Sequence, residues 1–179
     1  MAQGNLTIRG ATDSDVPLLL EFIRALADYE RLSHMVTATE ASLRESLFGA
    51  QPGAQALLAF EDDTPVGFAV YFHNFSTFLG RKGMWLEDLF VKPAYRGRGY
   101  GKALLHRVGQ IAHERGCGRF EWSVLDWNTP SIEFYRSLGA EPLSDWTIFR
   151  MTGKSLEQFA QRSKKPFSLR ENGGDEGKN

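Results

Sequence analysis

One stretch of the chain constrains the fold more than any other, because strand chemistry runs directly into a glycine-rich basic turn. An apolar strand pattern occupies residues 84–91 and stops at Lys92-Pro93; glycines follow at positions 97, 99 and 101, and a helical pattern runs from about residue 99 to 115. Glycines allow backbone N–H groups to close on a ligand, and the helix dipole favours negative charge at the helix N-terminus. The stretch therefore predicts an anion-binding turn between a strand and a helix.

Two other kinds of glycine-rich loop do not fit these residues. A Walker loop requires Ser or Thr after its lysine, whereas Ala103 follows Lys102. A dinucleotide-binding fingerprint would begin at Gly97, but Lys102 stands where its third glycine is required. A glycine-rich turn without a ligand is the remaining alternative. It would carry the unfolded-state entropy of several glycines with no compensating interaction.

Composition indicates one soluble domain with no general affinity for polyanions. The chain has 179 residues, of which 42% are hydrophobic and 24% charged, and its formal net charge is -1. This charge gives no support for nucleic-acid or membrane attraction. A single cysteine, Cys117, excludes an intrachain disulfide. The N-terminal residues lack leader features and no run reaches membrane-spanning length, so we expect a cytoplasmic protein with no membrane or nucleic-acid partner.

The rest of the chain alternates strand and helix patterns. Thr12–Asp15 offers caps for a first helix, and Thr37-x-x-Glu40 resembles a capping box for a second. Together the patterns predict an α/β (α+β) fold with a mixed sheet, in a single domain over residues 1–162 that is followed by a disordered tail at 163–179. Strands are expected at 6–9, 55–60, 66–75, 84–91, 119–125, 140–143 and 146–151, and helices ending near 29, 48, 115 and 138.

Two motifs resemble signatures of the GNAT superfamily of acyl-CoA N-acetyltransferases. The first is Arg96-x-x-Gly99-x-Gly101, and the second is the segment 128–140, Asn-Thr-Pro-Ser-Ile-Glu-Phe-Tyr-Arg-Ser-Leu-Gly-Ala. The resemblance implies the GNAT fold, a mostly antiparallel mixed sheet that is splayed at the acyl-CoA site and has helices on both faces. It also implies acetyl-CoA as co-substrate and no metal. The histidines show no metal-ligand spacing.

The resemblance also assigns residues to the acyl-CoA site. Backbone N–H groups of Leu89 and Val91 are candidates to stabilise the thioester oxygen as it becomes negative, provided that the strand splays there. The cofactor-binding candidates are Leu89, Phe90, Val91, Arg96, Gly97, Arg98, Gly99, Tyr100, Gly101, Lys102, Asn128 and Ser131.

Glu87 is the best-placed catalytic base in the sequence. An alkylammonium has a pKa near about 10, so the amine must lose a proton on the enzyme before it attacks. Glu87 lies inside an apolar strand that leads to the glycine turn, where a carboxylate without a partner is costly. Simple alternation predicts that Asp88 points to the opposite face. The alternative for Glu87 is a carboxylate paired with an arginine.

Tyr135 is the candidate acid that returns a proton to the departing thiolate. A phenol with a pKa near about 10 matches that role, and the resemblance implies it, since the tyrosine of the second motif protonates coenzyme A in many family members. The alternative is an aromatic residue that packs beside Phe134.

The amine site resembles that of the diamine branch, the spermidine/spermine N-acetyltransferases with their thialysine-type relatives. That resemblance implies a homodimer and makes Tyr29, Glu30 and Glu87 substrate-binding candidates. No further carboxylate follows closely after Glu30, and Arg81 precedes the catalytic strand. We therefore expect an acceptor smaller than spermine, either a lysine-like amino acid or a short diamine.

These observations predict an enzyme that moves an acetyl group from acetyl-CoA to a primary amine of a small molecule, by direct attack in a ternary complex. One alternative is a protein or peptide N-acetyltransferase. Another is a non-catalytic acyl-CoA sensor, against which the presence of both Glu87 and Tyr135 argues.

Overall fold

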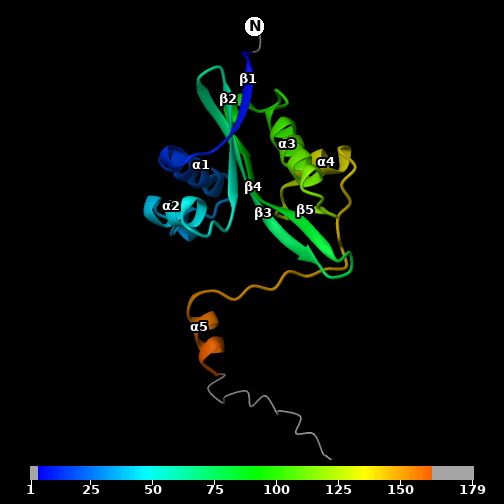
Figure 1. Cartoon of the computed structure of the whole chain (residues 1–179). Coiled ribbons are helices and arrows are strands. Elements are labelled where there is room, and N and C mark those ends of the chain that lie inside the picture. Colours follow the sequence, from blue (N-terminus) through cyan, green and yellow to red (C-terminus); the bar gives the residue numbers. More distant parts are fainter. Residues whose placement is uncertain (1–3, 163–179) are drawn as a thin grey trace, which may run out of the picture. The chain divides into compact units, whose positions relative to one another are not determined.

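The computed structural model describes residues 4–162 (Figure 1). These residues divide into two compact units at the junction between Asn128 and Thr129. The predicted tail at 163–179 lies outside the described residues, and the single domain over 1–162 stays a prediction. Within the described part of the chain, no helix is both long enough and apolar enough to cross a membrane.

The first unit is built on a five-stranded sheet in the order β1-β2-β3-β4-β5. The first four strands pair antiparallel, and β5 pairs parallel to β4. The sheet confirms the predicted mixed, mostly antiparallel architecture. Its strands are β1 (Leu6–Gly10), β2 (Gln55–Glu61), β3 (Thr64–Ser76), β4 (Arg81–Val91) and β5 (Phe120–Trp122).

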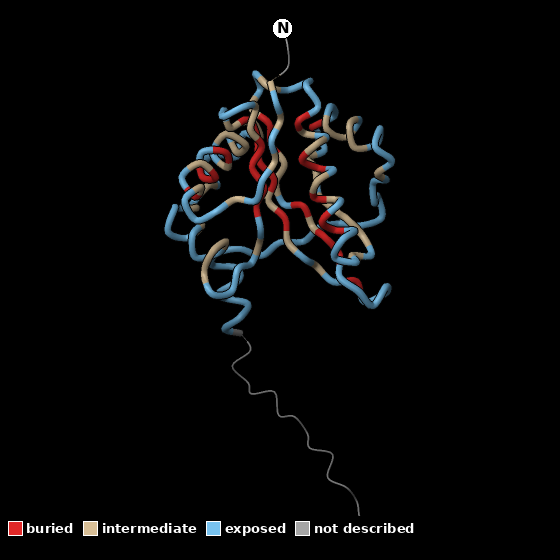
Figure 2. Tube along the Cα trace, turned by 45° about the horizontal axis from the view of Figure 1, so that its top comes forward, coloured by how far each residue is buried: buried red, intermediate tan, exposed pale blue. Residues whose placement is uncertain are grey.

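Helices cover both faces of this sheet, as expected (Figure 1). Helices α1 (Val16–Tyr29) and α2 (Glu40–Phe48) lie on one face, and α3 (Tyr100–Glu114) lies on the other. On the α1 face, the ring of Phe22 stacks on Phe68 at 5.4 Å and meets Phe90 edge-on at 6.3 Å. Figure 2 shows buried residues along the central strands and on the inward sides of α1 and α3.

Strands β4 and β5 stay together for only three residue pairs. Their parallel ladder joins Met84 to Phe120 at one end and Leu86 to Trp122 at the other. Antiparallel pairing of β4 with β3 continues to Val91. The β5 side of β4 therefore lacks a strand neighbour after Leu86 in the described chain, which is the splay that the family resemblance implies.

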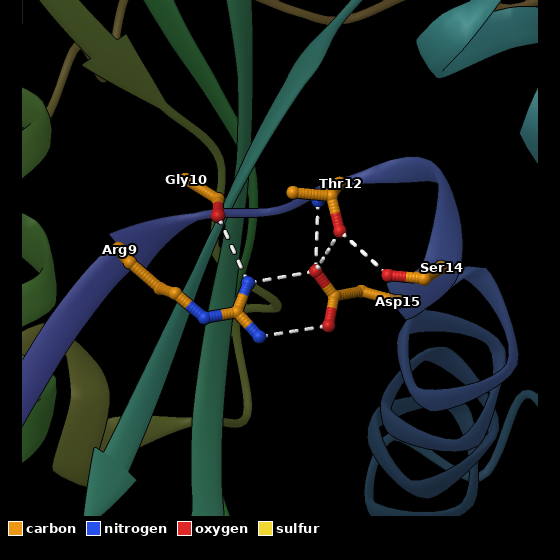
Figure 3. A network of polar contacts seen from close by, with 5 residues as sticks. All are labelled: Arg9, Gly10, Thr12, Ser14 and Asp15. Atoms are coloured by element: carbon orange, nitrogen blue, oxygen red, sulfur yellow. Dashed lines mark hydrogen bonds and ion pairs between the residues drawn. The ribbon is translucent and has the colours of Figure 1, made fainter.

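A polar network joins the end of β1 to the start of α1 (Figure 3). Arg9 makes two hydrogen bonds to the carboxylate of Asp15, at 2.7 and 2.8 Å, and the hydroxyl and backbone N–H of Thr12 donate to the same carboxylate. These bonds, led by the one from Arg9, hold the pKa of Asp15 well below its usual range. The predicted cap region thus fixes where α1 begins, after a short 3-10 turn at Asp13–Asp15.

The second helix begins with a different cap from the expected one. The side chain of Thr39 accepts a hydrogen bond from the backbone N–H of Ser42 at 3.1 Å, and Ser42 bonds back to Thr39 N–H at 2.9 Å. The capping box predicted at Thr37 and Glu40 is therefore wrong by two residues. A serine at the third helical position supplies the reciprocal bond in place of a glutamate.

The C-terminus of α1 closes with a Schellman motif. The backbone N–H of Leu32 donates to the carbonyl of Ala27 at 2.7 Å, and that of Arg31 donates to Asp28 at 3.0 Å. This pair of bonds requires a left-handed residue just after the helix. Arg31 takes that conformation, with φ of 62°.

The same motif closes α3 and α4 (Thr129–Ser137), but with glycine at the left-handed position. Gly116 after α3 has φ of 69° and Gly139 after α4 has φ of 87°. Glycine adopts this conformation freely, whereas a residue with a Cβ is strained there by about 1–2 kcal/mol. Arg31 is therefore held in a backbone conformation that its side chain disfavours.

The second unit contains α4 and α5 (Gly153–Arg162) in place of a closing pair of strands. The strands predicted at 140–143 and 146–151 are wrong, because that segment has no strand in the structure. A strand needs a ladder partner, and the described sheet ends at β5, which is three residues long in place of the expected seven at 119–125. The apolar residues that suggested these strands, among them Trp146, Ile148 and Phe149, are exposed.

We predict that Arg31→Gly stabilises the protein. Glycine removes the left-handed strain, and its greater unfolded-state entropy offsets part of the gain, so the free energy of unfolding should rise by about 0.5–1 kcal/mol. Chemical denaturation with both chains in one buffer measures the change.

The matched control is Gly116→Ala, at the same position of the motif after α3. Nothing lies within 4 Å of the added Cβ, so the effect comes from φ alone. The free energy of unfolding should fall by about 1 kcal/mol. If both substitutions changed the free energy of unfolding by the same amount in the same direction, the strain at Arg31 would be contradicted.

Candidate active site

A β-bulge at Glu87 brings two neighbouring carboxylates to one face of the sheet. Asp88 pairs with Val70 and Leu86 pairs with Tyr71, so Glu87 has no partner across the ladder. Val70 packs against the Phe22–Phe68 core, which places its partner Asp88 on the α1 face. The expectation that Asp88 points away from Glu87 is wrong, because the extra residue breaks the alternation on which it rested.

The side chain of Glu87 is held on that face by a tryptophan. The indole N–H of Trp85 donates to Glu87 Oε2 at 2.9 Å, and Trp85 pairs with Phe72, two residues along β3 from Val70. Glu87 is exposed and has no arginine partner among the described residues. The alternative in which Glu87 forms an ion pair with an arginine is therefore wrong for the described residues.

Asp88 carries the strongest electrostatic perturbation in this region. Burial, followed by the charges of Glu87 and Glu30, raises the pKa of Asp88 to about 7. Glu30 follows the last residue of α1, and burial raises its pKa as well. The structure thus gathers Glu30, Glu87 and Asp88 into one acidic cluster. Asp88 is the member that sequence reasoning missed; the signal was an acidic doublet in an otherwise apolar strand.

Tyr29, at the end of α1, is surrounded by cationic and aromatic groups. Its hydroxyl lies 3.4 Å from Oδ1 of the buried Asn128, and its ring lies 6.0 Å from that of Trp127. The guanidinium of Arg96 lies over the Tyr29 ring at 4.3 Å, and Arg96 Nε donates to the carbonyl of Val91 at 3.0 Å. Arg96 therefore ties the glycine turn to the end of α1, and its predicted contact with a phosphate stays a prediction.

The glycine turn has the backbone that the sequence predicted. Gly97 and Gly99 have φ of 75° and 86°, a conformation that favours glycine, and Gly99 is the N-cap of α3. The first helical hydrogen bond runs from Ala103 N–H to the Gly99 carbonyl at 2.9 Å. The amides of residues 100–102 therefore have no helical acceptor and can bind an anion.

The other side chains of the turn fasten it to the β2–β3 hairpin. Arg98 Nη1 lies 2.9 Å from both carboxylate oxygens of Glu61, and the hydroxyl of Tyr100 donates to the same carboxylate at 2.6 Å. Lys102 is exposed. Contacts of Arg98, Tyr100 and Lys102 with the cofactor stay predictions.

The open edge of β4 supplies further backbone donors. Lys92 N–H donates to Val66 of β3 at 2.9 Å, so alternation directs the amides of Leu89 and Val91 to the opposite edge, where β5 has ended. The amides at this edge would suit the thioester of acyl-CoA, and the amides at the start of α3 would suit its pyrophosphate. The described residues therefore suit acyl-CoA.

Two predicted residues lie in the second unit, on α4. Tyr135 is half-buried and its ring lies 5.3 Å from that of Phe134. Ser131 lies in the first turn of the same helix. Their roles as acid and as cofactor contact stay predictions. Among residues 4–162, no group of three His, Cys, Asp or Glu side chains is arranged to hold a metal ion.

The chain is similar in sequence to known acetyltransferases of small amines. Thialysine N-epsilon-acetyltransferase of Sus scrofa is 36% identical over 167 residues, covering 87% of this chain and 98% of the relative. L-ornithine N5-acetyltransferase NATA1 of Arabidopsis thaliana is 33% identical over 196 residues, covering 84% of this chain and 86% of the relative.

The fold has solved counterparts as well. An integron cassette protein of V. cholerae superposes with a TM-score of 0.73 at 27% identity, covering 87% of this chain and 98% of that one. The family model described as Acetyltransferase (GNAT) family matches residues 20–140, which include the bulge, the glycine turn and the second motif. The chain is an acyltransferase and belongs to the GNAT family of acetyltransferases.

Proposed function

We propose that this acetyltransferase transfers the acetyl group of acetyl-CoA to the terminal amine of a small diamino acid, in a ternary complex with no acyl-enzyme. The acidic cluster of Glu30, Glu87 and Asp88 carries the proposal, because it provides negative charge for a cationic amine beside the strand β4, whose edge is open after Leu86. Relatives named for thialysine and ornithine acetylation support the substrate class.

Each group of the site has a distinct task in this proposal. Acetyl-CoA, when bound, supplies the activated acetyl group. Glu87 accepts the amine proton, directly or through water, and ionised Asp88 stabilises the ammonium form during binding. The amides of Leu89 and Val91 donate to the thioester oxygen, and Tyr135 returns a proton to the thiolate.

Acetyl-CoA-dependent thiol release across a panel of amines tests the proposal. The panel contains thialysine, lysine, ornithine, putrescine, spermidine and a lysine-containing peptide. We expect the highest kcat/KM on the diamino acids. A preference for the peptide would favour the protein-acetyltransferase alternative, and tight coenzyme A binding without turnover of any amine would favour the sensor.

Tyr135→Phe tests the assignment of the acid. Removing the hydroxyl leaves the ring in place, so the variant should keep its coenzyme A affinity while kcat falls by about 10²-fold or more. Steady-state kinetics and calorimetric titration with coenzyme A measure the two quantities. An unchanged kcat would remove Tyr135 from the mechanism.

The pKa of Asp88 predicts a pH-dependent amine affinity. Protonated Asp88 attracts a cation less than the ionised form does, so the KM for the amine should fall as pH rises through about 7. In Asp88→Asn this inflection should vanish and KM should be higher at alkaline pH. A wild-type KM that is flat across this range would contradict the assignment.

Ionisation of Asp88 improves amine binding but lowers the stability of the fold. Its pKa is raised from 3.8 to about 7, so its contribution to stability is fully present below the lower value and is lost as pH rises through the upper one. Between about pH 5 and pH 8 the free energy of unfolding should therefore fall more in the wild type than in Asp88→Asn. Urea denaturation at both pH values measures the difference.

A cytoplasmic homodimer completes the proposal. Exposed apolar side chains of the second unit, including Trp146 and Phe149, support association, since large exposed apolar residues in one segment often mark an interface. Light scattering coupled to size-exclusion chromatography should give twice the chain mass of 20.1 kDa. A monomer at micromolar concentration would contradict this part of the proposal.

A further inference from the structure

Arg31 is an arginine at a position whose backbone favours glycine. The Schellman motifs that end α3 and α4 place Gly116 and Gly139 at the equivalent position. Among residues 4–162, the other non-glycine residue with positive φ is Asp62, a residue type that tolerates this conformation in turns. Strained conformations of this kind concentrate at functional sites.

The guanidinium of Arg31 lies beside the aromatic residues of the amine site. Its central carbon is 5.8 Å from the centre of the Trp127 ring, and Trp127 lies next to Tyr29. Arg31 is itself exposed, and so is Trp127, at 51%, so the guanidinium over the ring is accessible. No carboxylate within residues 4–162 forms an ion pair with Arg31, whereas Arg9, Arg44 and Arg98 each have one. Its hydrogen-bond donors are therefore available to a ligand.

The charges around Arg31 match those of an amino acid. Glu30 and Arg31 are adjacent in sequence and opposite in charge, which complements the ammonium and carboxylate groups on the α-carbon of a zwitterion. Glu30 is also close enough to Asp88 for its charge to raise the pKa of that carboxyl. A diamino acid with its α-carbon at the end of α1 can thus direct its terminal amine to Glu87 and Asp88 on β4.

We infer that Arg31 binds the α-carboxylate of the acceptor and thereby makes the enzyme select diamino acids over diamines of the same length. A planar guanidinium held over an aromatic ring is suited to bidentate recognition of a carboxylate. This inference rests on the proposed acetylation of a small amine. It adds a specificity-determining residue that the sequence motifs do not include.

Pairs of acceptors that differ only in the carboxylate test the inference. Lysine is compared with 1,5-diaminopentane, and ornithine with putrescine, at saturating acetyl-CoA. The wild type should prefer the amino acid in each pair. Arg31→Gly should lower kcat/KM for lysine and ornithine by about tenfold or more through KM, as expected for the loss of a charge-assisted contact, and should leave the diamines unchanged.

Arg31→Gly also distinguishes a loss of recognition from a loss of folding. The variant should have a higher denaturation midpoint than the wild type, although its kcat/KM for the amino acid acceptors is lower. Arg31→Lys, which keeps the charge, should retain part of the preference. Arg24→Gln is the matched control; Arg24 is an exposed residue of α1, and its replacement should leave kcat/KM unchanged for all four acceptors.

Two results would overturn the inference, and they distinguish a failure of the role of Arg31 from a failure of the proposed function. If Arg31→Gly lowers kcat/KM equally for lysine and 1,5-diaminopentane, Arg31 does not bind the carboxylate, and small-amine acetylation still stands. If the wild type acetylates none of the four acceptors, the proposed function itself fails, and the inference fails with it.

Discussion

β4 changes neighbours along its length, and the site depends on that change. Up to Leu86 it is bonded on both edges, to β3 and β5, and beyond that residue only to β3. The released edge provides the backbone donors at Leu89 and Val91. The bulge at Glu87, directly after the last β5 contact, turns two carboxylates to the α1 face. One strand therefore supplies the charge for the amine and the donors for the acyl group.

Arg96 couples this strand to the helix that completes the amine site. It donates to the carbonyl of Val91 at the end of β4 and lies over the rings of Tyr29 and Phe90. A planar cation makes both kinds of contact at once, which a lysine does not. The position of Tyr29 thus depends on the glycine turn, and a change in the turn reaches the amine site without touching a substrate residue.

Much of the first unit followed from local patterns. Apolar runs predicted the strands at 55–60 and 66–75, the glycines predicted the turn before α3, and the helical pattern predicted the end of α3 near residue 115. The errors lay where a long-range partner decides the outcome. The segment 140–151 contains the apolar residues on which the two closing strands were predicted, but β5 ends at Trp122 and no described strand extends the sheet beyond it. Periodicity reports what a segment can bury, and it does not report whether a neighbour is present.

The sequence by itself determined the family, the order of elements as far as α4 and the glycine turn before α3, because these depend on residue types at fixed spacing. Only the tertiary structure decided which side chains share a site. The face of Asp88 depends on one unpaired residue in the β3–β4 ladder, and the strain at Arg31 depends on how α1 ends. Neither feature has a signature in the residue composition or the hydrophobic periodicity of the sequence. Both depend on backbone hydrogen bonds that are present only in the folded chain.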